Sequence, residues 1–461
     1  MTDQNSEELK NEDFDMSIFD DDMDDDIINQ VDDHLANVHL QTPERPFKKS
    51  LISAPPEDDQ VFLLRLFYQR FFPYKTYFNW LNYGLDISKN FTHREFSFTL
   101  PSDIYIRYNS FANIDVMKKE IERLQPIKID IGAVYTVKPK DKKTVNEKVF
   151  KPLEKELVFD IDMTDYDEIR TCCSGGDICN KCWTFMTIAI KVIDAALRED
   201  FGFKHLLWVY SGRRGVHCWV SDERARKLDN ESRKAIVGFL EVIKGGAEVS
   251  RKVKLPYILH PSLNRSLEIV KMYFGSLVLG EQEVLDTPES WNKVLDFIND
   301  ADIKNDLNDQ WNESPSRSGI DKWQDLRNEL ERKKRPDRES VARDLIFQYT
   351  YPRLDDKVSV QINHLLKSPF CVHPKTQRVC VPINPEVCEK FDPLAVPTLS
   401  KLSEELNTYD AKDHNDSDRK IPDYKKTSLR PYIEIFEKFV NNLIIEKQRE
   451  KRDDAQTSME F

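Results

Sequence analysis

The stretch Leu157-Val-Phe-Asp-Ile-Asp162 is a short apolar run that ends in two acids. Its length and apolar character predict a buried β-strand, on which Asp160 and Asp162 share one face while Ile161 lies on the other. Two carboxylates this close repel each other unless a cation lies between them. Enzymes of phosphoryl transfer hold divalent metals in this way, and oxygen ligands favour Mg²⁺ or Mn²⁺. The alternative is an ordinary strand end before a turn at Thr164.

A third acid would strengthen this predicted metal site. The segment from Leu345 to Asp355 also looks like a strand, and it too ends in acids, Asp355 and Asp356. Sequence order gives no distance between Asp355 and Asp160. The sequence alone therefore leaves the third ligand open.

A loop with phosphate-binding chemistry lies between two predicted strands in the segment Tyr210-Ser-Gly-Arg-Arg-Gly-Val-His-Cys-Trp-Val220. Its two glycines let the backbone approach a ligand closely, and its adjacent arginines can bind phosphate oxygens through paired hydrogen bonds. These features predict a triphosphate site, although the sequence has neither a dinucleotide fingerprint nor a P-loop. The alternative is a solvated hairpin with two surface arginines. The candidate residues are Ser211, Gly212, Arg213, Arg214, Gly215, Val216 and His217.

Half of the eight cysteines lie within eleven residues, in the pattern Cys172-Cys173-x5-Cys179-x2-Cys182. In a chain without a secretory signal, this pattern indicates a structural zinc site rather than disulfides. An iron–sulfur cluster and unliganded cysteines are the alternatives. Adjacent ligands are geometrically awkward, so a distant histidine could replace Cys172 or Cys173.

Basic residues also cluster after the second acidic segment. The apolar spacing from Val358 to Leu365 predicts a helix that Pro369 ends, with His364 and Lys367 on one side of its last turn. Lys367 and His373 would add positive charge to a phosphate pocket. From the sequence alone, ordinary basic residues at a helix end are the better explanation of this pattern.

The net charge of −13 is concentrated at one end of the chain. Residues 1–33 contain 14 acids and one base, Lys10, which leaves 67 acids and 67 bases in the remainder. A neutral body can carry a basic face for nucleic acid if its charges are segregated. No apolar run approaches the roughly 18 residues that a membrane helix requires, and the acidic amino terminus is unlike a signal peptide, so we expect neither a membrane protein nor a secreted one.

Together, the order of these motifs resembles the small, catalytic subunit of eukaryotic DNA primase, in the archaeo-eukaryotic primase superfamily. The resemblance covers the chain from about Asp59 to its final helix. It rests on the four cysteines and the Tyr210–Val220 segment, and on the following further motifs. These are Phe159-Asp-Ile-Asp-Met-Thr-Asp-Tyr-Asp167, Pro352-Arg-Leu-Asp355, His364-Leu-Leu-Lys-Ser-Pro-Phe370, Trp80-Leu-Asn-Tyr83, His93-Arg-Glu-Phe-Ser-Phe-Thr-Leu100 and Asp423-Tyr-Lys-Lys-Thr-Ser-Leu429.

The resemblance implies roles for individual residues. Asp160, Asp162 and Asp355 would bind two catalytic Mg²⁺ or Mn²⁺ ions, and the four cysteines would hold a structural Zn²⁺ ion. The incoming ribonucleotide would lie against one set of side chains. This set comprises Glu95, Ser211 to His217, His364, Leu365, Leu366, Lys367 and His373.

The resemblance also implies a mixed α/β (α+β) catalytic fold with mixed sheets and an inserted helical subdomain. Residues 1–52 lie outside the resemblance; their acidic charge predicts a disordered extension, with a short amphipathic helix at Ile27, Val31 and Leu35 as the alternative. The catalytic domain would comprise residues 53–240, including the zinc motif at 172–182, and residues 351–461 with the C-terminal helix. The helical subdomain would occupy residues 241–350.

We therefore expect a primase that makes short RNA primers de novo on single-stranded DNA, for replication initiation and lagging-strand synthesis. The family works in the nucleus with a large primase subunit, which carries an iron–sulfur cluster, and with DNA polymerase α and its accessory subunit. One alternative is a metal-dependent transferase that binds a nucleotide sugar through Asp160 and Asp162. The other is a zinc-containing subunit that only scaffolds a replication complex.

Overall fold

The computed structural model describes residues 60–244, 253–333, 338–412 and 421–457. The predicted acidic extension and its alternative helix at Ile27 to Leu35 lie outside these residues. Within the described ranges, no helix is both long enough and apolar enough to cross a membrane.

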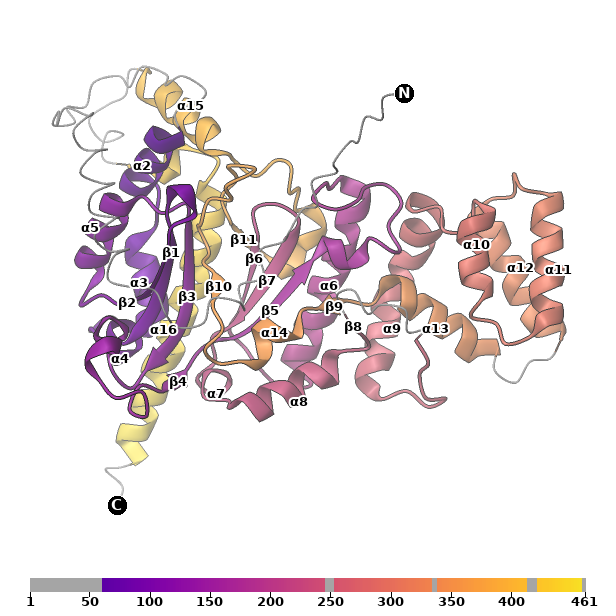
Figure 1. The fold of residues 1–461 in the computed structure, drawn as a ribbon, viewed down its shortest axis with the longest axis horizontal. Coiled ribbons are helices and arrows are strands. Elements are labelled where there is room, and N and C mark those ends of the chain that lie inside the picture. Colours follow the sequence, from indigo (N-terminus) through magenta and orange to yellow (C-terminus); the bar gives the residue numbers. More distant parts are fainter. Residues whose placement is uncertain (1–59, 245–252, 334–337, 413–420, 458–461) are drawn as a thin grey trace, which may run out of the picture. The chain divides into compact units, whose positions relative to one another are not determined.

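The first sheet lies at the amino-terminal end of the described chain and is antiparallel throughout (Figure 1). Its strands run in the order β10-β3-β1-β2, and β4 also pairs with β3. The strands are β1 (Arg94–Thr99), β2 (Tyr105–Asn109), β3 (Lys128–Tyr135), β4 (Pro152–Glu154) and β10 (Leu366–Lys367). The helices near them are α2 (Gln60–Arg70), α3 (Tyr74–Asn82), α4 (Lys89–Thr92) and α5 (Ile114–Leu124).

The second sheet is also antiparallel, in the order β11-β6-β7-β5, and it carries the two predicted motifs. The acidic strand is confirmed as β5, and β6 and β7 flank the arginine loop as predicted. Every residue of β6 and β7 is buried, and Trp219 of β7 packs edge-on against Trp80 of α3. Its strands are β5 (Leu157–Asp162), β6 (Leu206–Tyr210), β7 (Gly215–Val220) and β11 (Pro382–Ile383). Nearby helices are α6 (Asn180–Glu199), α7 (Glu223–Arg226), α8 (Asn230–Leu240), α15 (Leu399–Asp410) and α16 (Arg430–Thr457).

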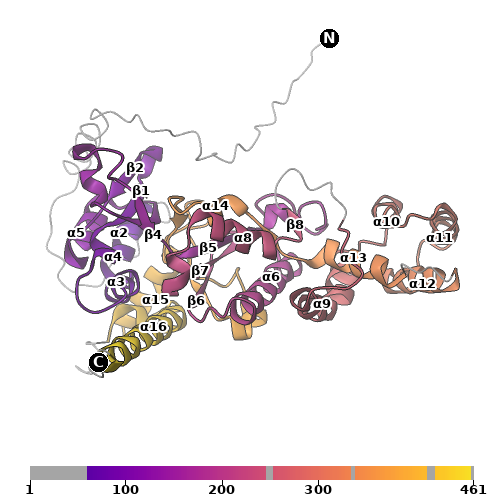
Figure 2. The same ribbon diagram turned by 90° about the horizontal axis from the view of Figure 1, so that it is seen from below.

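A helical region lies between the second sheet and Asp355 in the sequence, and Figure 2 shows its helices from a second direction. A short parallel pair, β8 (Ile243–Lys244) with β9 (Arg353–Leu354), joins the point where the chain enters this region to the point where it leaves. Residues distant in sequence therefore return to the edge of β5. The helices are α9 (Pro261–Tyr273), a π-helix (Phe274–Glu281), α10 (Pro288–Leu295), α11 (Ala301–Glu313), α12 (Gly319–Arg332) and α13 (Arg338–Thr350).

Two local predictions were wrong. The segment Leu345–Thr350 is the end of helix α13, not a strand. The sequence suggested a strand because this part of the helix is buried on nearly all sides and therefore lacks amphipathic spacing. The helix predicted to reach Leu365 ends early, as α14 (Asp356–Val360). The residues after it pair with β3 as strand β10, so a tertiary contact overrides the local helical pattern.

Candidate active site

The three candidate acids meet at the end of strand β5. Asp160 and Asp355 form an antiparallel bridge, in which the backbone N–H of Asp355 donates to the carbonyl oxygen of Asp160 at 3.2 Å. Asp160 and Asp162 lie on one face of β5, with side chains 28% and 35% exposed. The structure thus supplies the proximity of Asp355 that sequence order left open.

Mutual repulsion is evident at this cluster. Burial, followed by the negative charges of Asp162 and Asp355, raises the pKa of Asp160 to about 8. Burial also raises the pKa of Asp355. A divalent cation would relieve this repulsion by replacing a proton, so the cluster has the electrostatics of a cation site.

Strand pairing places the arginine loop beside these acids. The β5–β7 register sets His217 opposite Asp160, and Gly215 opposite Asp162. Arg214 donates from Nε to the Asp162 carboxylate at 2.9 Å, and Nε2 of His217 lies 3.5 Å from Oδ1 of Asp160. A side chain at Gly215 would collide with the carbonyl oxygen of Ile161, which explains glycine at this position.

Positive charges converge on the other side of the loop. Burial, followed by the charges of Lys367, Arg213 and Arg214, lowers the pKa of His373 to about 3. Burial and Lys367 likewise lower the pKa of His217 to about 3. Both imidazoles are therefore neutral beside three cations. Neutral ring N–H groups and cations together suit an anionic ligand such as a polyphosphate.

The loop and the His373 segment are in direct contact. Gly212 has φ +90°, and a Cβ atom there would lie 2.7 Å from Cβ of His373 and 3.1 Å from the sulfur of Cys380. Thr376 donates to the carbonyl oxygen of Gly212 at 2.6 Å. Ser211 and Val216 are buried at the two ends of the turn, and Oγ of Ser211 accepts from the N–H of Gly215 at 3.0 Å. The turn is thus fixed in shape.

Glu95 lies in the first sheet and borders the 364–367 segment. Its carboxylate accepts from Arg107 at 3.0 Å and from Tyr135 at 3.1 Å. Between Glu95 and Leu365 lies Gly132, where a Cβ atom would come within 2.7 Å of Leu365 and 3.0 Å of Glu95. Glu95 therefore lies close to the 364–367 segment, with which the family resemblance placed it in the nucleotide pocket.

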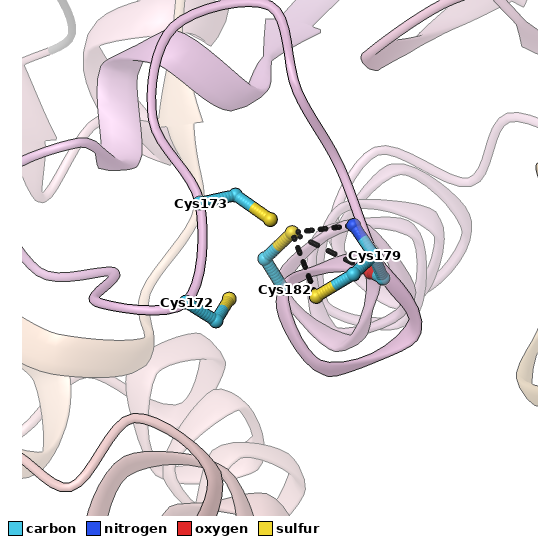
Figure 3. A group of neighbouring side chains, drawn as sticks. All are labelled: Cys172, Cys173, Cys179 and Cys182. Atoms are coloured by element: carbon cyan, nitrogen blue, oxygen red, sulfur yellow. Dashed lines mark hydrogen bonds between the residues drawn. The ribbon is translucent and has the colours of Figure 1, made fainter.

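The four clustered cysteines converge at the start of helix α6 (Figure 3). Their sulfur atoms all lie within 4.8 Å of one another, and Figure 3 shows them directed toward a common space. Four thiolates around Zn²⁺ at about 2.3 Å would have sulfur atoms about 3.8 Å apart, so a tetrahedral ion fits with little adjustment. The adjacent pair, Cys172 and Cys173, contributes both sulfurs, and no distant histidine is needed.

A profile of the DNA primase small subunit matches residues 159–385. The chain is 44% identical over 412 residues to the DNA primase small subunit of Schizosaccharomyces pombe, covering 84% of this chain and 90% of that protein. It is 40% identical over 400 residues to the subunit of Drosophila melanogaster, covering 83% and 91%. For Saccharomyces cerevisiae the identity is 39% over 414 residues, covering 86% and 97%.

The chain belongs to the DNA primase small subunit family. It is accordingly a DNA primase with the primase catalytic fold, as its motifs predicted, rather than a nucleotide-sugar transferase or an inactive scaffold. A small primase subunit implies a larger partner subunit.

Sequence reasoning missed several polar residues that support this primase site. Arg107 binds Glu95, and Lys128 is one of the charges that depress the pKa of His217. Gln282, buried after the π-helix, donates to the sulfur of Cys172 at 3.5 Å. No local motif marks these residues, because their partners are 12 to 110 residues away in the sequence.

Proposed function

We propose that this primase small subunit extends RNA on single-stranded DNA by two-metal phosphoryl transfer at the Asp160, Asp162 and Asp355 cluster. The observation that carries the proposal is the bridge between Asp160 and Asp355, opposite an arginine loop. The carboxylates, which repel each other, suit a bound metal ion, and the cationic side chains beside them suit the phosphates of a nucleotide. The three carboxylates would hold two Mg²⁺ or Mn²⁺ ions, which when bound favour attack of a ribose 3′-oxygen on the α-phosphorus.

The protein's own groups would orient the nucleotide and its leaving group. Arg213, Arg214 and Lys367 would bind the β- and γ-phosphates and stabilise the charge that develops on departing pyrophosphate. His217 and His373, both neutral, would donate ring N–H groups to the same phosphates. Contacts to the rest of the nucleotide would come from Ser211, Gly212, Gly215, Val216, Glu95, His364, Leu365 and Leu366.

The four cysteines would hold a structural Zn²⁺ ion close to this site. The cysteine loop follows β5 by way of a short helical turn and then enters helix α6. A metal there would cross-link the loop that follows Asp162, from Cys172 to Cys182. Its role would be to hold the end of the acidic strand rather than to take part in catalysis.

Partners and location belong to the same proposal. The larger partner would be the iron–sulfur primase subunit, acting with the catalytic and accessory subunits of DNA polymerase α in the nucleus. Ribonucleoside triphosphates and a single-stranded DNA template would be the substrates. The relatives are named as small primase subunits, which supports the two-subunit assembly.

One assay tests this proposal. The isolated chain receives labelled ribonucleotides and single-stranded DNA without a primer, with and without Mn²⁺. We expect template-dependent RNA synthesis that requires the metal and disappears in Asp160→Ala, while circular dichroism and zinc content stay unchanged. Metal-dependent synthesis retained by Asp160→Ala would falsify the assignment of the acids.

A further inference from the structure

The proposed nucleotide site is built on two separate sheets. Asp160 and Asp162 belong to β5 in the second sheet, whereas Lys367 belongs to β10 in the first. In-line attack demands that acids and phosphate-binding groups keep a fixed distance, because misplacement by about 1 Å costs on the order of a hundredfold in rate. Some contact between the sheets must therefore set this distance.

Lys155 makes such a contact. It lies in the two-residue link between β4 of the first sheet and β5 of the second, five residues ahead of Asp160, and its side chain is fully buried. Its ammonium nitrogen donates to the backbone carbonyl oxygen of His364, the residue that opens the 364–367 segment. One side chain thus connects the strand of the acids to the segment of Lys367.

The backbone at Lys155 is held rigidly. Its N–H donates to the carbonyl oxygen of Arg226 at 3.1 Å, and its own carbonyl accepts from the buried guanidinium of Arg233. The next residue, Glu156, is paired with Arg94 at 2.8 Å, with both side chains completely buried. Lys155 therefore projects from a fixed base.

The amine has no charged partner of its own. In the described ranges, no carboxylate lies within ion-pair distance of Lys155, and burial followed by the charge of Arg233 lowers its pKa to about 7. Burying an amine is costly unless its hydrogen bonds are satisfied. The carbonyl oxygen of His364 meets that need, and the amine can donate to it in either protonation state.

The other end of the contact leads straight to the phosphate-binding lysine. After His364, Leu366 pairs with Ile131 and Lys367 with Asp130, and the N–H of Ser368 donates to the carbonyl oxygen of Ile129 at 2.8 Å, so the strand β10 itself is only two residues long. So short a strand has little rigidity of its own. A fixed carbonyl oxygen of His364, just before β10, would fix the direction in which the Lys367 side chain points from the sheet.

We infer that Lys155 is a positioning residue of the primase site, which holds the 364–367 segment in register with the acids of β5. This inference rests on the proposed nucleotide-binding role of Lys367. Lys155 itself touches neither the acids nor the nucleotide. Its loss would therefore weaken nucleotide binding while leaving the metal cluster in place.

The test compares Lys155→Met with the matched control Lys227→Met. Methionine keeps most of the buried side-chain volume but removes the donor, whereas Lys227 is largely exposed and pairs with Glu223. We expect Lys155→Met to raise the ribonucleotide KM about tenfold, the effect of about 1.4 kcal/mol from one lost hydrogen bond, with kcat changed less than twofold. Hydrogen exchange should accelerate at amides 365–368, while the Mn²⁺ Kd and zinc content stay at wild-type values.

Each outcome has a distinct meaning. An inactive wild-type chain would refute the proposed function itself. An active wild-type chain with an unchanged KM or unchanged exchange in Lys155→Met would overturn only the role of Lys155. If Lys155→Met does not fold, Lys155→Leu, which also removes the donor, replaces it under the same criteria. Failure of both variants to fold would also overturn the inference, because Lys155 would then serve the core.

Discussion

Binding of Mn²⁺ to the acid cluster should depend steeply on pH. Burial and two neighbouring carboxylates raise the pKa of Asp160 to about 8, so the metal-free cluster holds a proton at neutral pH. Because the metal needs the charged form, binding must displace that proton. With a pKa of about 8, the charged fraction is about 3% at pH 6.5 and about 24% at pH 7.5. The Kd for Mn²⁺ should therefore fall about eightfold across this interval and level off above pH 8.5.

Calorimetric titration in buffers with different ionisation heats measures both the Kd and the protons released. We expect close to one proton released per cluster at pH 7, and almost none at pH 9. The proton belongs to the coupled acids as a group, so Asp160→Asn should abolish the release together with tight binding. A Kd for Mn²⁺ that is constant between pH 6.5 and 8.5, without proton release, would refute the reasoning.

The raised pKa of Asp160 also determines how the stability of the metal-free protein changes with pH. The folded-state pKa of Asp160 lies above the ordinary value of 3.8, so its stabilising contribution is complete below about pH 4 and is lost as the pH rises through about 8. Without metal, Asp160→Asn should therefore melt at a higher temperature than the wild type at pH 8.5. The difference should shrink toward pH 5, and a constant difference would contradict it.

Three further substitutions probe separate contacts. Arg214→Ala should raise the ribonucleotide KM by about tenfold or more, because it removes charged hydrogen bonds to phosphate; an unchanged KM would exclude this arginine from the phosphate site. Gly215→Ala should destabilise the fold by about 1–3 kcal/mol in urea unfolding, because its Cβ would collide with the carbonyl oxygen of Ile161; unchanged stability would mean that the strands yield freely. Gln282→Leu should speed zinc release to a chelator, because Cys172 loses a donor; wild-type release would show that this contact is dispensable.

The parts of the site that sequence predicted are those encoded by neighbouring residues. Strand β5 carries its apolar run and both acids within six residues, and β6, the glycine-containing turn and β7 are equally local. The cysteine spacing likewise specifies a compact cluster without any distant partner. Alternation and turn chemistry act over a few residues, so these features can be deduced from the chain alone.

The two wrong secondary-structure predictions have the opposite cause, because the contacts that decide these segments come from residues far away in the sequence. Leu366 and Lys367 read as the end of a helix but form a strand, because they pair with β3, more than two hundred residues earlier. Leu345 to Thr350 reads as a strand because burial on nearly every side hides its helical period. The contact of Lys155 with His364 also joins residues 209 positions apart in the sequence. Long-range pairing of this kind leaves no local signature.

The most direct measurement of the central claim compares two adjacent acids, Asp355 and Asp356. Asp355 bridges to Asp160, whereas Asp356 begins helix α14 and is exposed. We expect Asp355→Ala to abolish metal-dependent RNA synthesis on single-stranded DNA, and Asp356→Ala to retain activity within about twofold of the wild type. Equal activity in the two variants, whether high or low, would contradict a catalytic site built from three converging acids.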